Sequence, residues 1–118
     1  TMNRDRLLAD AKAKALALVD GYQAPEKPVF KLAGASGRTG VAGAVADFRA
    51  KGVATAYDEV VAGRLAEVLT GGEADIVDTV TEDELLKLER KAFVASVKDP
   101  RTQARVEHML TTGKPLRN

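Results

Sequence analysis

The chain has 118 residues, enough for one domain with a modest core and too few for two domains that each exclude water. Its 18 Lys and Arg residues balance 17 Asp and Glu residues, which disfavours binding to nucleic acid or to anionic lipid. Cysteine is absent, so disulfides, thiolate metal sites and Cys-dependent mechanisms are excluded. No apolar run approaches the roughly 20 residues that span a bilayer. We therefore expect a soluble, cytoplasmic chain that forms a single domain over residues 1–118.

Alanine, leucine and valine dominate the composition and aromatic residues are few, which favours helices over sheets. We predict an all-α fold, in which about five amphipathic helices form a small irregular bundle with one Pro-containing extended connector. Asn3 is placed to cap the first helix, and Gly21 to end it. Apolar residues in this stretch recur at steps of three and four, as on one face of a helix: Leu8, Ala11, Ala15, Leu18 and Val19.

The connector follows over residues 22–32. Pro25 and Pro28 cannot lie inside a helix, and the alternation of Phe30 and Leu32 suggests an extended strap over the core. We predict that this segment is not a strand in a sheet.

Three further helices are predicted from their caps. Ser36 opens one that Gly52 closes, with Val41, Ala44, Val45 and Phe48 on its buried side. Thr55 and Asp58 form a capping box for the next, which stops at Gly71 and Gly72. This helix carries the clearest apolar stripe of the chain: Tyr57, Val60, Val61, Leu65, Val68 and Leu69. Thr81 and Glu84 form a second box, for a helix that presents Leu85, Leu88, Ala92 and Phe93 inward.

A fifth helix is expected after Asp99, which is a suitable cap because Pro100 then occupies the first helical position. We expect this helix to bury Val106, Met109 and Leu110 before it reaches Gly113.

The most prominent local motif is a run of three glycines, Gly34, Gly37 and Gly40, ahead of a predicted helix. Such glycines allow a backbone to approach a pyrophosphate at a helix N-terminus, and Arg38 would add a cation. A dinucleotide-binding fold also needs several parallel strands, and the segments that follow keep a helical period. We favour a plain turn that leads into a helix over a nucleotide site.

Other candidate groups have structural explanations. His108 is the only histidine, and packing explains it better than catalysis because no nucleophile stands in a recognisable motif. Glu82, Asp83 and Glu84 occupy the first turn of a predicted helix, where the helix dipole favours acidic side chains. This structural explanation is favoured over a catalytic or metal-binding role. We therefore predict no catalytic and no metal-binding residue in this chain. Lys114, Arg117 and Arg105 form a small basic end that suits either a phosphate or solvent.

The last third of the chain resembles a known family. Residues 85–93, 99–110 and 113–118 read LLKLERKAF, DPRTQARVEHML and GKPLRN. They are similar, in this order, to the C-terminal end of bacterial 3-hydroxyacyl-CoA dehydrogenases that carry an enoyl-CoA hydratase/isomerase (crotonase-like) region. The first helix and segments around residues 36–38, 46–48, 61–62 and 69–72 also look like that family.

The resemblance implies that the chain is the C-terminal fragment of a multidomain enzyme of fatty-acid β-oxidation. The parent enzyme would use NAD and bind acyl-CoA. The fragment's partner would be the remainder of the parent, and the assembly could also be a homo-oligomer. The fragment itself would be inactive and hold no cofactor, while covering the acyl-CoA site or packing subunits. Lys114, which precedes a proline, and Arg117 would make at most a weak contact to a CoA phosphate. The alternative is a free-standing helical module that binds other proteins.

Helices that belong to a larger enzyme should expose apolar residues outside their main stripes. The candidates for this exposed surface are Leu7 and Leu16 on the first helix, and Leu86 and Val97 on the fourth.

Overall fold

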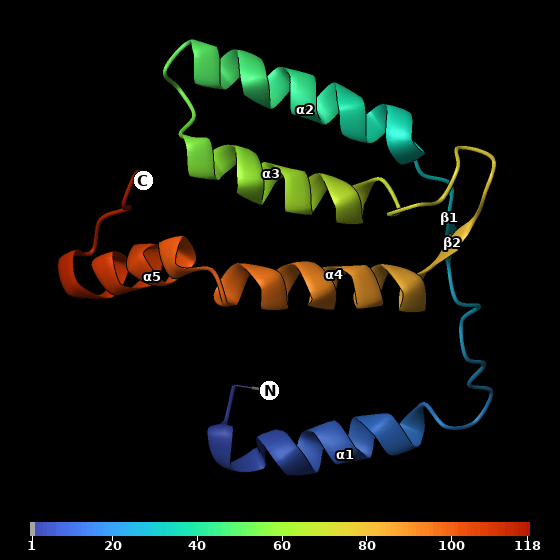
Figure 1. Cartoon of the computed structure of the whole chain (residues 1–118). Coiled ribbons are helices and arrows are strands. Elements are labelled where there is room, and N and C mark those ends of the chain that lie inside the picture. The colour runs from blue at the N-terminus through green and yellow to red at the C-terminus, as the bar shows by residue number, and fades with distance from the viewer. Residues whose placement is uncertain (1) are drawn as a thin grey trace.

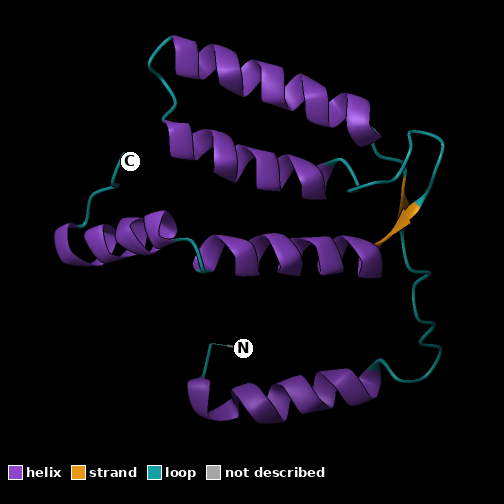
Figure 2. Ribbon diagram, in the orientation of Figure 1, coloured by secondary structure: helices purple, strands orange, loops and turns teal. Residues whose placement is uncertain are grey.

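The structure is a computed structural model that describes residues 2–118. It confirms an all-α fold, with five α-helices and two short strands over these residues (Figure 2). A 3-10 turn at Arg4–Arg6 leads into the first helix, and Figure 1 shows the order that follows. The bounds are α1 Leu7–Ala17, β1 Val29–Phe30, α2 Gly34–Ala50, α3 Ala56–Leu69, β2 Val80–Thr81, α4 Glu82–Val97 and α5 Pro100–Thr112.

The helices α2, α3 and α4 lie side by side, and α5 continues beyond the end of α4 (Figure 1). The small core lies around α3, where Tyr57 and Ala66 are buried, together with Val80 of β2 and Thr70 just after α3. An ion pair between Arg49 and Glu59 ties α2 to α3.

Three predicted caps are confirmed. The Thr55 hydroxyl accepts from the Asp58 N–H at 3.1 Å, and the Asp58 carboxylate accepts from the Thr55 N–H at 2.8 Å. Thr81 and Glu84 form the same reciprocal pair at the start of α4. Asp99 caps α5 by accepting from the Arg101 N–H at 3.1 Å, and proline occupies the first turn. These motifs need only neighbouring residues, which is why the sequence reveals them.

Two predicted boundaries were wrong. The first helix ends at Ala17, four residues before Gly21, because the chain turns through Leu18 and Val19 with short-range bonds to Ala15 and Leu16. The second helix begins at Gly34 instead of Ser36. No side chain caps its start, and the Ser36 hydroxyl donates to the Ala33 carbonyl at 2.9 Å from inside the first turn.

The connector also differs from its prediction, because part of it is a strand. Val29 pairs with Thr81 and Phe30 with Val80 in an antiparallel ladder of two residues per strand. The partner lies about fifty residues further along the chain, so no local pattern announces the pairing. The ladder fixes the connector beside the start of α4, where Lys27 also pairs with Asp83 at 3.1 Å.

The molecule is open. Its radius of gyration is 20.6 Å, whereas a compact chain of this length is expected near about 13.5 Å. In Figure 1, α1 lies apart from the other helices, and only Asp10 among its side chains is even half-buried. The five helices therefore do not share one core, which differs from the bundle that the sequence predicted.

Several residues predicted to be buried are exposed, because helical period identifies an apolar face without saying whether another element covers it. None of the helices in the described part of the chain is both long and apolar enough to cross a membrane. The exposed residues that lie on a predicted apolar stripe or on a side predicted to be buried are Leu8, Ala11, Ala15, Leu18, Val19, Val41, Ala44, Phe48, Leu65, Leu69, Phe93, Val106, Met109 and Leu110.

Candidate functional site

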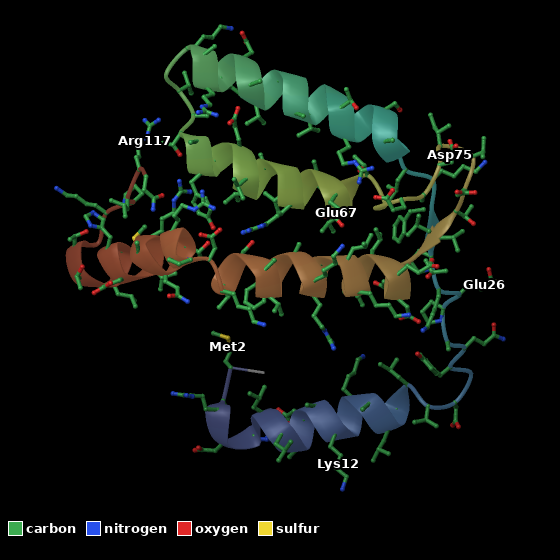
Figure 3. All side chains as sticks on the ribbon, viewed as in Figure 1. Met2, Lys12, Glu26, Glu67, Asp75 and Arg117 are labelled. Carbon is green, nitrogen blue, oxygen red and sulfur yellow. The ribbon has the colours of Figure 1, made fainter. Side chains whose placement is uncertain are left out.

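The basic end of the chain folds back along α5. Gly113 ends that helix in the left-handed conformation, with φ of +69°. The Arg117 guanidinium then donates to the Val53 carbonyl at 2.5 Å, in the loop between α2 and α3, and Figure 3 shows Arg117 near that loop. Asn118 donates to the Arg101 carbonyl at 3.1 Å and accepts from Arg105 at 2.7 Å. The tail thus links α5 to the α2–α3 loop.

Lys114 and Arg117, the two sequence-predicted phosphate contacts, have different surroundings. The Lys114 side chain is exposed, and its backbone N–H donates to the Thr112 hydroxyl at 3.2 Å. Arg117 is exposed as well, although Val53 accepts one of its hydrogen bonds. Arg105, the third member of the predicted basic end, pairs with Asp58 at 2.9 Å. Lys114 is therefore the cation of this set that solvent reaches most freely.

Beside the tail lies a cluster that the sequence did not predict, which we call the tyrosine cluster: Tyr57, Arg64, Asp99, Arg101, Thr102 and Arg105. Tyr57 is 1% exposed, and two guanidinium groups lie against its ring. The Arg101 Cζ is 4.2 Å from the ring centroid and the Arg105 Cζ is 4.8 Å from it, both within the range of cation–π attraction. The Tyr57 hydroxyl lies 2.5 Å from the Thr102 hydroxyl.

Asp99 provides the negative charge of the tyrosine cluster. Its carboxylate pairs with Arg101 at 2.9 Å and with Arg64 at 3.3 Å. The hydrogen bond from the Arg101 side chain is the largest of the causes that lower the pKa of Asp99 far below its ordinary value. The backbone N–H of Thr55 similarly lowers the pKa of Asp58, which pairs with Arg105. Carboxylates held in their ionised form are poorly suited to general acid–base work at neutral pH, so this arrangement fits a structural joint between α3, α4 and α5.

The three glycines lie within the first two turns of α2. The Gly34 N–H donates to the Thr70 carbonyl at 3.0 Å, and its φ is +57°. A Cβ on Gly34 would lie 2.7 Å from the Ala74 carbonyl oxygen, and one on Gly37 would lie 2.5 Å from the Ala33 Cβ and 3.2 Å from a Thr70 methyl group. Two of the glycines therefore permit close packing of α2 against residues 70–74, which explains them without a ligand.

The remaining candidates lie apart from the tyrosine cluster or serve in caps. His108 is half-buried on α5. Asp83 and Glu84 are used by Lys27 and by the Thr81 capping box, respectively. Within residues 2–118, no group of three or more His, Cys, Asp or Glu side chains is placed to hold a metal ion.

An apolar groove of about 670 Å³ runs between α3 and α4. We call it the α3–α4 groove. The sequence predicted Leu86 as exposed, and the structure confirms this, as it does for Leu7, Leu16 and Val97. It did not predict that Leu65, Leu69 and Phe93 would be exposed beside Leu86, because only the packing of α3 on α4 brings them together. The groove is lined by Val61, Arg64, Leu65, Val68, Leu69, Leu86, Glu89, Arg90, Ala92, Phe93 and Ser96.

Comparison with known proteins gives one informative relative. No family model matches the chain, and no solved structure matches it. The chain is 37% identical over 119 aligned residues to a protein of Bacillus subtilis (strain 168) named "Probable 3-hydroxyacyl-CoA dehydrogenase". The alignment covers 100% of this chain but 15% of that protein. Over its whole length, the chain is therefore homologous to one segment of a much longer protein that carries the name of a 3-hydroxyacyl-CoA dehydrogenase.

Proposed function

We propose that this chain is a helical part of a larger 3-hydroxyacyl-CoA dehydrogenase, to which it supplies packing surface and no catalytic group. The proposal rests mainly on one observation, which is that the whole chain aligns with 15% of a protein named for that activity. The exposed leucines and valines of its helices support the proposal, since parts of a larger enzyme keep such surface for their neighbours.

The finer proposal follows the resemblance of the chain's ending. The parent would belong to fatty-acid β-oxidation and combine NAD-dependent dehydrogenation with a crotonase-like hydratase region. Its remainder would hold NAD and the acyl-CoA, while the present helices cover the acyl-CoA site or pack subunits together. The tyrosine cluster supports a structural role, because its arginine donors and its carboxylate are already paired with one another.

The tail would then contribute little to CoA binding. Ion pairs made by an exposed cation are worth about 0–1 kcal/mol and are screened by salt. Lys114 can meet a phosphate without losing a side-chain bond that the structure shows, whereas Arg117 would have to release the Val53 carbonyl. We expect any CoA contact of this tail to be weak and to rest mainly on Lys114.

Two assays test the proposal on the chain itself. The purified chain should neither reduce NAD with a 3-hydroxyacyl-CoA nor hydrate crotonyl-CoA. Amide shifts of the isotope-labelled chain on titration with CoA should be weak, salt-sensitive and confined to residues 113–118. Reproducible turnover would contradict the proposal, as would saturable micromolar binding centred on residues 34–40.

A second function, a free-standing module that binds other proteins, is favoured by one observation. The α3–α4 groove is apolar and open, as is usual for grooves that receive a helix from a partner. The two functions differ in the size of the native protein, which a mass measurement on the source organism decides.

A further inference from the structure

The helix α1 lacks the packing that a helix of its length needs. It has 11 residues, and isolated helices shorter than about 12–15 residues are marginal in water. Its apolar residues Leu8, Ala11 and Ala15, with Leu18 just after it, are spaced by three and four and share one face. Figure 1 shows this helix apart from the others, and those four residues are all exposed. The helix therefore presents an apolar stripe that the chain's own described helices do not cover.

The α3–α4 groove exposes apolar side chains that a further helix could cover. It is about 670 Å³ in volume, and four of its large apolar side chains are more than half exposed: Leu65, Leu69, Leu86 and Phe93. Grooves formed by two packed helices with apolar walls are suited to receive the apolar face of a third helix. Each chain thus carries one helix without a partner and one groove of the kind that receives a helix.

We propose that two copies of this chain exchange their first helices, so that α1 of each copy lies in the α3–α4 groove of the other. The connector supports exchange over docking within one chain. Pro25 and Pro28 fix their own φ angles and stiffen the segment, and the β1–β2 ladder anchors its end beside α4. From that anchor the connector leads to α1, which lies beneath α4 and separate from it (Figure 1). Exchange of an identical element between two copies is a route to a dimer that costs little free energy.

The exposed area is of the size that a stable dimer requires. The chain exposes 9237 Å², whereas a compact monomer of 12.5 kDa exposes about 6,200 Å² by the usual scaling with mass. The excess is about 3,000 Å² per chain. Obligate dimers bury about 2,000–5,000 Å² in total, so two copies have enough surplus surface to form such an interface. The exchange assigns α1 and the α3–α4 groove to packing between copies, and so uses part of the exposed apolar surface that the proposed function assigns to packing in general.

Substitution of two alanines on opposite faces of α1 provides a matched test. Positions 15 and 13 are two residues apart, which places them about 200° apart around the helix axis. Ala15 lies on the apolar stripe and Ala13 lies opposite it, and both are exposed. Ala15→Glu places a charge in the groove of the partner copy and should raise the dissociation constant of the dimer at least tenfold. Ala13→Glu, the same change on the same helix, should leave the dimer intact.

Light scattering over a range of concentrations measures the association. The unsubstituted chain should approach about twice 12.5 kDa, and only Ala15→Glu should shift toward the monomer. A strict monomer at every concentration would overturn the proposal, and so would equal effects of the two substitutions.

A mixed-label experiment then shows whether the helix crosses between copies. The chain has no cysteine, so Ala13→Cys places a single nitroxide label on the side of α1 that faces away from the groove. Chains that carry the nitroxide but no isotope label are mixed with isotope-labelled chains that lack the nitroxide. Broadening of amides in residues 61–69 and 86–93 of the labelled copy is the expected result. Broadening that occurs only when both labels are on the same molecule would show docking within one chain and contradict the exchange. Neither result depends on whether the native protein is longer than this chain.

Discussion

Arg64 of α3 reaches Asp99 at the start of α5, with 3.3 Å between the Nη2 of the arginine and the Oδ2 of the aspartate. The same carboxylate caps α5 and pairs with Arg101, whose guanidinium lies over the Tyr57 ring. The Asp99 side chain is only 9% exposed. It caps α5 and, through Arg64, ties the start of that helix to α3. The orientation of α5 relative to the rest of the molecule should depend on it.

The first prediction separates the two roles of Asp99. Asp99→Asn keeps a side-chain oxygen that can cap α5, but it removes the charge that attracts Arg64 and Arg101. Asp99→Ala removes both. We expect both variants to unfold at a lower temperature than the unsubstituted chain, with the alanine variant lower than the asparagine variant. Thermal unfolding followed by circular dichroism measures this order, and equal midpoints for all three chains would contradict it.

The second prediction concerns the stability of the folded chain at acidic pH. The pKa values of Asp99 and Asp58 are lowered in the folded chain from their ordinary value of 3.8, and that of Glu84 from 4.5. The unfolded chain therefore binds protons first as the pH falls, so the free energy of unfolding should be steady near neutral pH and decline below about pH 5. Chemical unfolding at several pH values measures the decline, and Asp99→Asn should make it shallower. A stability that rises as the pH falls through this range would contradict the pairing.

The third prediction tests the buried ring. Tyr57→Ala should cost about 3–5 kcal/mol of unfolding free energy, because it empties the centre of a small core. Tyr57→Phe keeps the ring in contact with Arg101 and Arg105 and removes only the hydroxyl that meets Thr102, so it should cost about 0.5–1.5 kcal/mol. Urea denaturation measures both values, and a phenylalanine variant as unstable as the alanine variant would assign the stability to the hydroxyl instead.

The fourth prediction compares the three glycines of α2. Gly34→Ala forces a side chain into a left-handed conformation that costs about 1–2 kcal/mol, and it also brings a Cβ to 2.7 Å from a carbonyl oxygen. Gly37→Ala should likewise destabilise the contact with Ala33 and Thr70. Gly40→Ala is the control, because nothing lies within 4 Å of its Cβ position and alanine favours a helix by about 0.5–1 kcal/mol. If all three substitutions stabilise the chain, α2 does not pack against residues 70–74 as described.

The limits of the sequence follow from the range of each interaction. The capping pairs Thr55 with Asp58 and Thr81 with Glu84 could be predicted because they join residues three apart. The ladder between Phe30 and Val80 could not, since it joins distant segments that each supply only two residues. The tyrosine cluster likewise needs α3 and α5 to be brought together before Tyr57 meets Arg101. Helical period correctly assigned the helices, but it placed exposed residues such as Phe93 in a core because it does not reveal which faces remain uncovered.

If this chain forms part of a larger dehydrogenase, its native protein is much longer than 118 residues. The most direct test is to isolate, from the source organism, the native protein that contains peptides of this sequence, and to measure its intact mass. We expect a mass several times 12.5 kDa, since the relative's aligned segment is 15% of that protein. A native product of about 12.5 kDa would contradict it and favour the free-standing module.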